Sequence, residues 1–301
     1  MKKLLLILAG LAAIVAGAGL LPLRPPAFTE GARVDIDGVA VRYVQRGAGP
    51  DVLLIHGMAG TAEDWETLMP LLAPHYRVTA VDLLGQGGSD SAPGAHNIVG
   101  NARAFARLAE RLGLSDVVVV GHSYGGAIAL KLATDAWPRA HGYVLLAPAT
   151  RPIDLSITDR VAAVPVFGLG LARLAQPFVG EGMIRSGLAV ATGPDGASFP
   201  AGFVDIRVQR WNRGDMLHAY SQQHVAFNRE LAEISGNYAS ITRPVLILQG
   251  DRDEYRALIE GSRALAQAVP HARLIELPGA GHYLQYKDPQ AVMTAVAAVR
   301  R

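Results

Sequence analysis

Six short apolar runs constrain the fold of this chain more than any other feature of its sequence. They lie at residues 51–57 (DVLLIHG), 77–83, 116–121 (DVVVVG), 142–148, 243–250 and 272–279. Runs without polar alternation are typical of strands that are covered on both faces. Segments with helical spacing, such as residues 62–74 and 97–113, separate them. Apolar strands that alternate with helices predict βαβ units. The predicted fold class is therefore α/β, with a mostly parallel sheet and helices on both faces.

Two other segments depart from this alternation. Residues 32–47 form two alternating runs around Asp37-Gly38, which is typical of a hairpin and would add antiparallel edge strands. Between about residue 150 and residue 242 the sequence looks helical and irregular, so we expect an inserted helical cap or lid above the strand ends. The expected organisation is a signal anchor or signal peptide (1–24), the first part of the core (25–149), the cap (150–242) and the second part of the core (243–301).

The N-terminal segment has the pattern of an export signal. Lys2 and Lys3 precede an uncharged apolar run from Leu4 to Leu23. As a helix, about 20 such residues would cross the roughly 30 Å hydrocarbon layer of a membrane. An uncleaved anchor is favoured because the run exceeds the roughly 7 to 15 residues usual in a signal peptide; cleavage near Ala16-Gly17-Ala18 is the alternative. Either interpretation places the remaining chain outside the cytoplasmic membrane, tethered or secreted.

The composition disfavours several classes of function. The 28 basic and 26 acidic residues are interspersed and leave a formal charge of +2, so we expect no nucleic-acid partner. The chain contains no cysteine, which removes disulfides, thiolate metal sites and a cysteine nucleophile. It also lacks the G-x-x-x-x-G-K-[ST] and H-E-x-x-H patterns, and no G-x-G-x-x-G follows a predicted strand. We therefore expect neither a cofactor nor a metal; the sequence leaves the oligomeric state open.

Residues 121–125 (GHSYG) match G-x-S-x-G at the junction between a predicted strand and a predicted helix. A hydroxyl at the tip of such a turn forces its own residue into a strained backbone conformation. Side chains two positions away would collide, and glycine at positions 121 and 125 avoids the collisions. The following helix points its N-terminus at the site and favours negative charge there. This context predicts that Ser123 is a nucleophile rather than a helix cap.

From about Gly31 to its C-terminus the chain resembles the α/β-hydrolase family of serine esterases and lipases. Five motifs occur in the order of that family: LLIHGMAG, VDLLGQGGSD, GHSYGG, VLILQGDRD and GAGHYLQYKDP. A single motif of this kind would be weak, but five in order are specific. The resemblance implies the order nucleophile, acid and histidine along the chain.

A serine hydroxyl needs a base within hydrogen-bond reach and a carboxylate that orients the base. His271 and His282 follow a plausible acid; His271 lies in a turn, whereas His282 lies in a loop of small residues after a strand, so we choose His282. Asp251, Asp253 and Glu254 follow the preceding strand. The Gly-x-x-Asp pattern of the family falls on Asp253, which leaves Asp251 as the second choice.

The resemblance also implies an oxyanion hole formed by the backbone N–H groups of Met58 and Tyr124. The implied function is a serine hydrolase that cleaves carboxylic esters, of small molecules or lipids, through an acyl-enzyme on Ser123. One alternative is another reaction on this fold: hydrolysis of a carbon–carbon bond, an amide or a thioester, or a cofactor-free haloperoxidase. The other alternative is a catalytically silent receptor or scaffold.

Overall fold

An eight-stranded sheet runs through the protein. The computed structural model describes residues 2–21, 28, 30–92, 94–152, 154–211 and 214–301. The strands are β1 (Ala32–Ile36), β2 (Val39–Arg46), β3 (Asp51–Ile55), β4 (Arg77–Val81), β5 (Val117–His122), β6 (Ala140–Leu146), β7 (Val245–Gly250) and β8 (Ala272–Leu277). Their order is β1-β2-β4-β3-β5-β6-β7-β8, and β3 to β8 are parallel. The hairpin of β1 and β2 pairs antiparallel at one side. The predicted α/β fold is confirmed.

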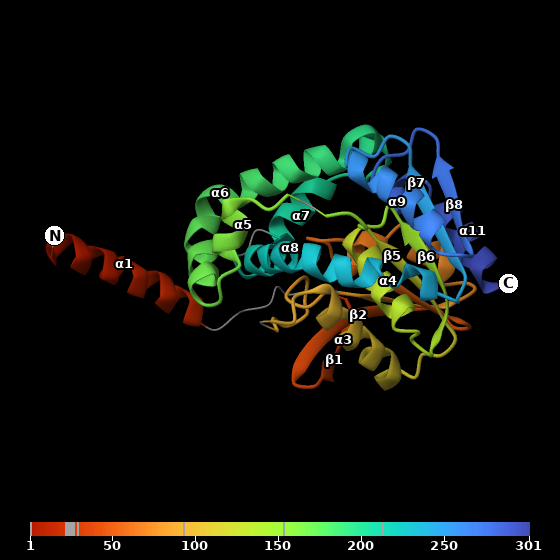
Figure 1. The fold of residues 1–301 in the computed structure, drawn as a ribbon, viewed down its shortest axis with the longest axis horizontal. Coiled ribbons are helices and arrows are strands. Elements are labelled where there is room, and N and C mark those ends of the chain that lie inside the picture. The colour runs from red at the N-terminus through yellow and green to blue at the C-terminus, as the bar shows by residue number, and fades with distance from the viewer. Residues whose placement is uncertain (1, 22–27, 29, 93, 153, 212–213) are drawn as a thin grey trace.

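Helices cover both faces of the sheet (Figure 1). The helices of the described chain are α1 (Lys2–Leu20), η1 (Ala62–Trp65), α2 (Met69–Leu72), α3 (Ile98–Arg111), α4 (Tyr124–Thr134), α5 (Ile157–Ala162), α6 (Phe167–Thr192), η2 (Gly193–Ser198), α7 (Phe203–Trp211), α8 (Gly214–Ser235), η3 (Tyr238–Ser240), α9 (Arg256–Ala268), α10 (Leu284–Lys287) and α11 (Pro289–Arg300). Successive strand residues alternate between the two faces. Leu53 belongs to the same buried apolar cluster as residues of α3, α4 and α9, whereas Leu54 belongs to the cluster that includes residues of α2 and α11.

The segment 62–74, which has helical spacing, does not form one helix. It forms η1 and α2, two short helices of four residues each. Pro70 explains the interruption because it has no backbone N–H and is tolerated only in the first turn of a helix. A new helix therefore begins at Met69, with Pro70 in its first turn.

Between β6 and β7 the chain forms α5, α6, η2, α7, α8 and η3, which we call the helical insertion (residues 150–242). Phe227 and Leu231 of α8 are buried in the same core cluster as α3 and α4. Glu230 of α8 also accepts a hydrogen bond from the N–H of Ile98, the first residue of α3. The insertion is thus held on the core by both apolar and polar contacts.

The predicted membrane anchor is wrong. Within the described part of the chain, no helix is long and apolar enough to cross a membrane. The helix α1 has 19 residues and begins with Lys2 and Lys3. At about 1.5 Å per residue its apolar part is shorter than the roughly 30 Å hydrocarbon layer. The predicted location outside the cytoplasm, tethered or free, was inferred from this segment alone and is withdrawn with the anchor. The predicted domain boundary at residues 24 and 25 lies outside the described residues.

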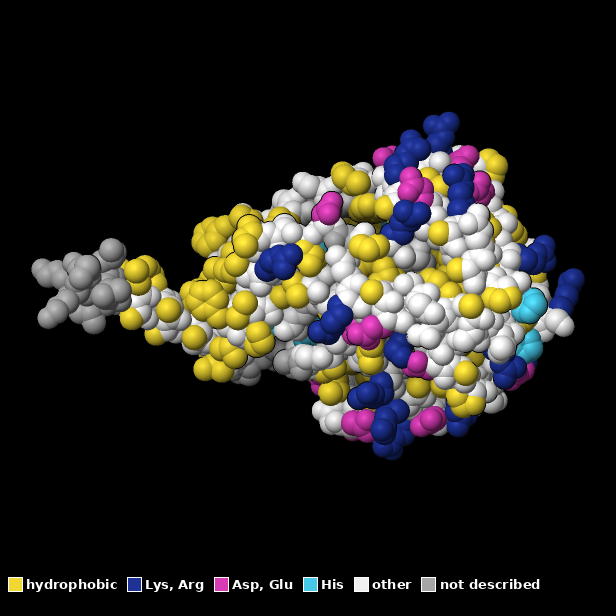
Figure 2. Space-filling model, viewed as in Figure 1, with side chains coloured by type: hydrophobic (Ala, Val, Ile, Leu, Met, Phe, Trp, Pro, Cys, Tyr) yellow, Lys and Arg dark blue, Asp and Glu magenta, His cyan; other side chains and the backbone are white. Residues whose placement is uncertain are grey.

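Instead of standing alone, the C-terminal half of α1 packs against α6. The two backbones touch where glycines carry no side chain: a Cβ on Gly19 would lie 2.0 Å from the carbonyl oxygen of Val166. Arg173 of α6 donates to the carbonyl oxygens of Ala18 and Leu21 at 2.6 and 2.9 Å. Apolar side chains remain on the outer surface of this end of the molecule, as Figure 2 shows. Within α6, the side chain of Phe178 is 87% exposed.

A buried ion pair joins the helical insertion to the core. Arg207 of α7 lies 2.5 Å from Asp64 of η1, and both side chains are about 95% or more buried, with exposed fractions of 5% and 2%. We expect Arg207→Met to lower the free energy of unfolding by about 3–5 kcal/mol, because it leaves a carboxylate buried without its partner. In the described part of the chain, Arg185 pairs only with exposed carboxylates, so Arg185→Met should change the free energy of unfolding little. Urea titrations of the wild type and of both variants measure this free energy. Equal losses would contradict this assignment.

The side chain of His96 makes the stability depend on pH. Its Nε2 accepts from the N–H of Ala92 at 2.9 Å, and its Nδ1 lies 2.6 Å from Oε1 of Gln222. Burial lowers the pKa of His96 to about 4. Between about pH 6.5 and 4, His96 therefore binds a proton in the unfolded chain but not in the folded one. In this range its contribution to the free energy of unfolding falls by about 1.4 kcal/mol for each unit that the pH drops. Urea titrations should show the advantage of the wild type over His96→Gln shrinking from pH 7.5 to 5; a constant difference would contradict the assignment.

Candidate active site

Ser123 stands on a strained turn between β5 and α4. Its backbone has φ 52° and ψ −116°, a conformation that residues with a side chain rarely adopt. A Cβ on Gly121 would lie 2.4 Å from the carbonyl oxygen of Gly125, and a Cβ on Gly125 would lie 2.2 Å from that of Ile55. The turn therefore requires glycine at positions 121 and 125, as the sequence pattern predicts.

His282 and Asp253 are in contact at the carboxyl ends of the strands. Nδ1 of His282 lies 2.9 Å from Oδ2 of Asp253, and the exposed fractions of the two side chains are 6% and 0%. Asp253 also accepts hydrogen bonds from the N–H of Tyr255 at 2.9 Å and from Nε2 of Gln249 at 3.1 Å. Ser262 in turn donates to Gln249. These donors hold the carboxylate in one orientation, with one oxygen directed at the imidazole.

The alternative residues lie elsewhere. Asp251 is exposed and accepts a hydrogen bond from the N–H of Gly279 at 2.7 Å, so it stabilises the turn after β8. His271 is exposed in the turn before β8. Of the two aspartates considered from the sequence, the structure brings Asp253 and not Asp251 to His282.

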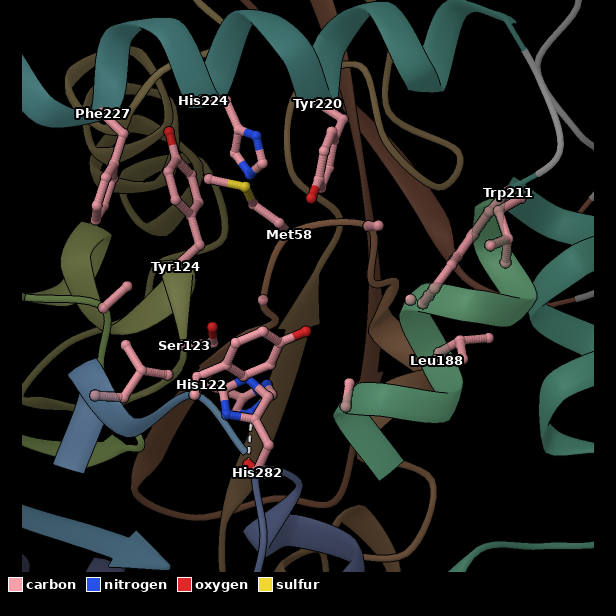
Figure 3. A pocket seen from close by; sticks show the side chains of 18 of the residues that line it. Met58, His122, Ser123, Tyr124, Leu188, Trp211, Tyr220, His224, Phe227 and His282 are labelled. Atoms are coloured by element: carbon pink, nitrogen blue, oxygen red, sulfur yellow. Dashed lines mark hydrogen bonds between the residues drawn. The ribbon is translucent and has the colours of Figure 1, made fainter. Parts of the chain in front are cut away.

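Ser123 and His282 line the same cavity (Figure 3). In the described part of the chain, the Ser123 hydroxyl makes no hydrogen bond with the imidazole of His282. Catalytic hydrogen bonds are often long before a substrate is bound. His122, the residue before Ser123, connects β5 to the loop of His282. Its Nε2 donates to the carbonyl oxygen of His282 at 3.0 Å, and the centroids of the two imidazole rings are 4.7 Å apart. Burial holds the pKa of His122 well below its usual value, so its ring is neutral.

The backbone groups proposed for the oxyanion hole flank Ser123. A Cβ on Gly57 would lie 3.2 Å from Cβ of Ser123. The backbone just before Met58 therefore lies close to Ser123. Tyr124 is the first residue of α4, so its N–H has no acceptor within the helix. Met58 and Tyr124 both line the cavity. Their role as oxyanion donors stays a prediction.

The cavity has a volume of about 470 Å³, in the size range of small-molecule sites. Core residues at the strand ends form one side of it, and α6 and α8 of the helical insertion form the other (Figure 3). Most of its lining is apolar, including Met58, Leu188, Trp211, Leu217 and Phe227. The arrangement therefore suits a small, mainly apolar molecule next to Ser123.

Three supporting residues, Asp195, His122 and Gln249, could not be found from the sequence. Asp195 of η2 accepts a hydrogen bond from the N–H of Gly281 at 2.8 Å, which fixes the loop of His282 from the side of the insertion. Its exposed fraction is 1%, and burial raises the pKa of its carboxyl. His122 occupies the variable position of G-x-S-x-G, where the pattern carries no information. Gln249 lies on β7 with an apolar sequence around it, so nothing marks it as a partner of Asp253.

Among the residues that the structure describes, no group of three or more His, Asp or Glu side chains is arranged to hold a metal ion. The cavity likewise has no cluster of cationic side chains around a glycine-rich turn that would hold a phosphate group of a cofactor.

The fold and the strained serine turn define a class of protein, and the comparisons agree with it. A sequence model described as the alpha/beta hydrolase fold matches residues 50–289, so the chain belongs to this family. A crystal structure of an alpha/beta hydrolase fold protein from Burkholderia ambifaria superimposes with a TM-score of 0.73 at 24% identity, covering 91% of this chain and 100% of that one.

Curated relatives of this chain carry different names. The dihydrolipoyllysine-residue acetyltransferase component of the acetoin cleaving system of Cupriavidus necator is 38% identical over 115 residues, which are 38% of this chain and 31% of that protein. The chain therefore spans about a third of that relative. A non-heme haloperoxidase of Rhodococcus erythropolis is 29% identical over 256 residues, which are 82% of this chain and 90% of that protein. The family supports a hydrolase, while its members differ in reaction.

Proposed function

We propose that the protein is a serine hydrolase that cleaves carboxylic esters through an acyl-enzyme on Ser123. The observation that carries this proposal is the 2.9 Å contact between His282 and the buried Asp253, made in the wall of the cavity into which the strained Ser123 opens. We further propose that the helical insertion is the cap of this cavity, because α6 and α8 line it opposite the strand ends.

In the proposed reaction, Nε2 of His282 takes the proton of the Ser123 hydroxyl while Oγ attacks the ester carbonyl carbon. The tetrahedral intermediate collapses, the carbon–oxygen bond to the alcohol breaks, and the alcohol leaves with the proton from His282. A water molecule then attacks the acyl-enzyme while Nε2 of His282 takes its proton; the bond between the acyl carbon and Oγ of Ser123 breaks, His282 returns the proton to Oγ, and the acid is released. Asp253 stays ionised and keeps the proton on Nδ1, because its Oδ2 faces that nitrogen.

The negative charge that develops on the carbonyl oxygen requires donors already in place. We assign this role to the N–H groups of Met58 and Tyr124. Tyr124 is supported by its position as the first residue of α4, where the helix dipole adds to its effect. Met58 is supported by the approach of the neighbouring Gly57 to Ser123.

The direct test is hydrolysis of p-nitrophenyl esters by the full chain, with acyl groups from acetate to decanoate, together with labelling by a fluorophosphonate probe. We expect turnover of at least one ester and one labelled residue, Ser123. The absence of turnover and of labelling across the series would favour a silent receptor or scaffold on this fold.

A second candidate is a haloperoxidase, which is favoured by the similarity to the Rhodococcus erythropolis protein over 82% of this chain. Halogenation of monochlorodimedone with hydrogen peroxide and bromide measures this activity. A rate of halogenation that exceeds ester turnover by the same preparation would favour this candidate over the esterase.

A further inference from the structure

Two polar side chains of α8 face the cavity from the helical insertion. Tyr220 and His224 both line the cavity, and their ring centroids are 4.2 Å apart. Figure 3 shows both rings extending from α8 into the space in which Ser123 lies. The proposed hydrolysis at Ser123 uses neither of them. Their role must therefore be sought in what the cavity binds.

Asp159 of α5 determines which nitrogen of His224 carries the proton. Nδ1 of His224 lies 3.2 Å from Oδ1 of Asp159. Burial raises the pKa of the Asp159 carboxyl, but the hydrogen bonds from Ser156 outweigh it and leave this pKa below its usual value. The ionised carboxylate can only accept, so Nδ1 carries the proton and Nε2 is left as an acceptor.

The ring of His224 is neutral, because burial lowers its pKa by more than the charge of Asp159 raises it. Burial also raises the pKa of the Tyr220 phenol, which therefore keeps its proton and can donate it. Within the described ranges, neither the Tyr220 hydroxyl nor Nε2 of His224 has a hydrogen-bond partner. The cavity thus offers one donor and one acceptor side by side.

The other residues of α8 that line the cavity, Met216, Leu217 and Phe227, are apolar, and Met58 lies close to the two polar groups. A polar group that is closed off from water costs free energy unless it has a partner. When an apolar substrate fills the cavity and displaces water, the two groups lose their partner. A substrate that brings its own donor and acceptor to this place avoids that cost.

We propose that Tyr220 and His224 form a binding subsite for a hydroxyl group on an otherwise apolar ester. Tyr220 donates to the oxygen of this hydroxyl, and the hydroxyl proton is donated to Nε2 of His224. Because the two rings are in contact, one small group can reach both. A carboxylate has no proton for Nε2, and an ammonium group has no lone pair for Tyr220. This inference rests on the proposed ester hydrolysis and names the class of ester.

The test uses esters that differ in one hydroxyl. Initial rates of the full chain are measured by pH-stat with methyl hexanoate and its 3-, 5- and 6-hydroxy derivatives, and with hexyl acetate and its hydroxyhexyl counterparts. At least one hydroxylated ester should have a kcat/KM about 10- to 100-fold above that of its parent, because sites built to bind a hydroxyl discriminate against analogues without it.

The substitutions His224→Phe and Tyr220→Phe each remove one partner, and each should lower the ratio of kcat/KM between hydroxylated and parent ester about tenfold. His271→Phe is the matched control, because this histidine is exposed before β8 and should leave the ratio as it is. Thermal unfolding shows that each variant is folded. A ratio near one for every pair, or a preference that survives both substitutions, would overturn the subsite.

Failure of the subsite and failure of the reaction can be told apart. If neither a parent ester nor a hydroxylated ester is hydrolysed, ester hydrolysis itself is refuted. The subsite is then judged from dissociation constants of the same ester pairs on Ser123→Ala, measured by calorimetry, where a tenfold preference lost in Ser123→Ala/His224→Phe supports it. Equal dissociation constants within each pair refute it.

Discussion

Ser123→Ala should lower kcat/KM for p-nitrophenyl butyrate at least about 10⁴-fold, because removal of the nucleophile from a serine triad leaves only binding and oxyanion stabilisation. Alanine keeps a Cβ and leaves the strained turn in place, so the melting temperature should change little. The assay is initial-rate hydrolysis combined with fluorophosphonate labelling, which should disappear.

Ser240→Ala serves as the control for this substitution, because Ser240 is exposed in η3 and is not among the residues that line the cavity. It should keep both the turnover and the labelling of the wild type. Labelling that persists in Ser123→Ala would show that another residue is the nucleophile.

Asp253→Asn should lower kcat about 10³- to 10⁴-fold, because the imidazole loses the carboxylate that selects its tautomer. Neither orientation of the asparagine amide at position 253 preserves all the hydrogen bonds of the carboxylate. If its nitrogen faces Nδ1 of His282, the imidazole must carry its proton on Nε2, where it cannot accept one from serine. If its oxygen faces His282, its nitrogen meets the N–H of Tyr255, so that two donors oppose each other.

Asp251→Asn is the matched control, two residues away on the same loop. Its carboxylate contacts the N–H of Gly279 and not the imidazole, so kcat should fall far less. Turnover of both variants on the same ester ranks the two aspartates. A larger loss in Asp251→Asn would reassign the acid.

Most of the fold could be predicted because its signals are local. The valines from Val117 to Val120 are buried on both faces of the sheet, and such a run has few other uses in a chain of this length. The hairpin is local as well: Asp37 and Gly38 both have positive φ, as the turn between β1 and β2 requires. Pro70 also signalled the break between η1 and α2, but the helical spacing around it obscured that signal.

The site could be predicted in part. The turn of Ser123 is encoded within five residues, whereas the pairing of His282 with Asp253 joins residues 29 positions apart and followed from resemblance to a family. The contact of Asp195 with Gly281 spans 86 positions and lies in an irregular segment, so nothing in the sequence indicates it. The N-terminal run was misinterpreted because its apolar character fits a membrane, and only the structure shows its contact with α6.

The division of the cavity wall has a consequence for how such a protein diversifies. Ser123, Asp253 and His282 come from the ends of core strands, while the opposite wall comes from α6 and α8. We therefore expect mutations in these two helices to alter ligand preference while leaving the three proposed catalytic residues undisturbed. Asp195 is an exception to this separation, because this residue of the insertion accepts a hydrogen bond from Gly281 in the loop of His282. Laboratory evolution of new selectivity is best directed at α8, with η2 held constant.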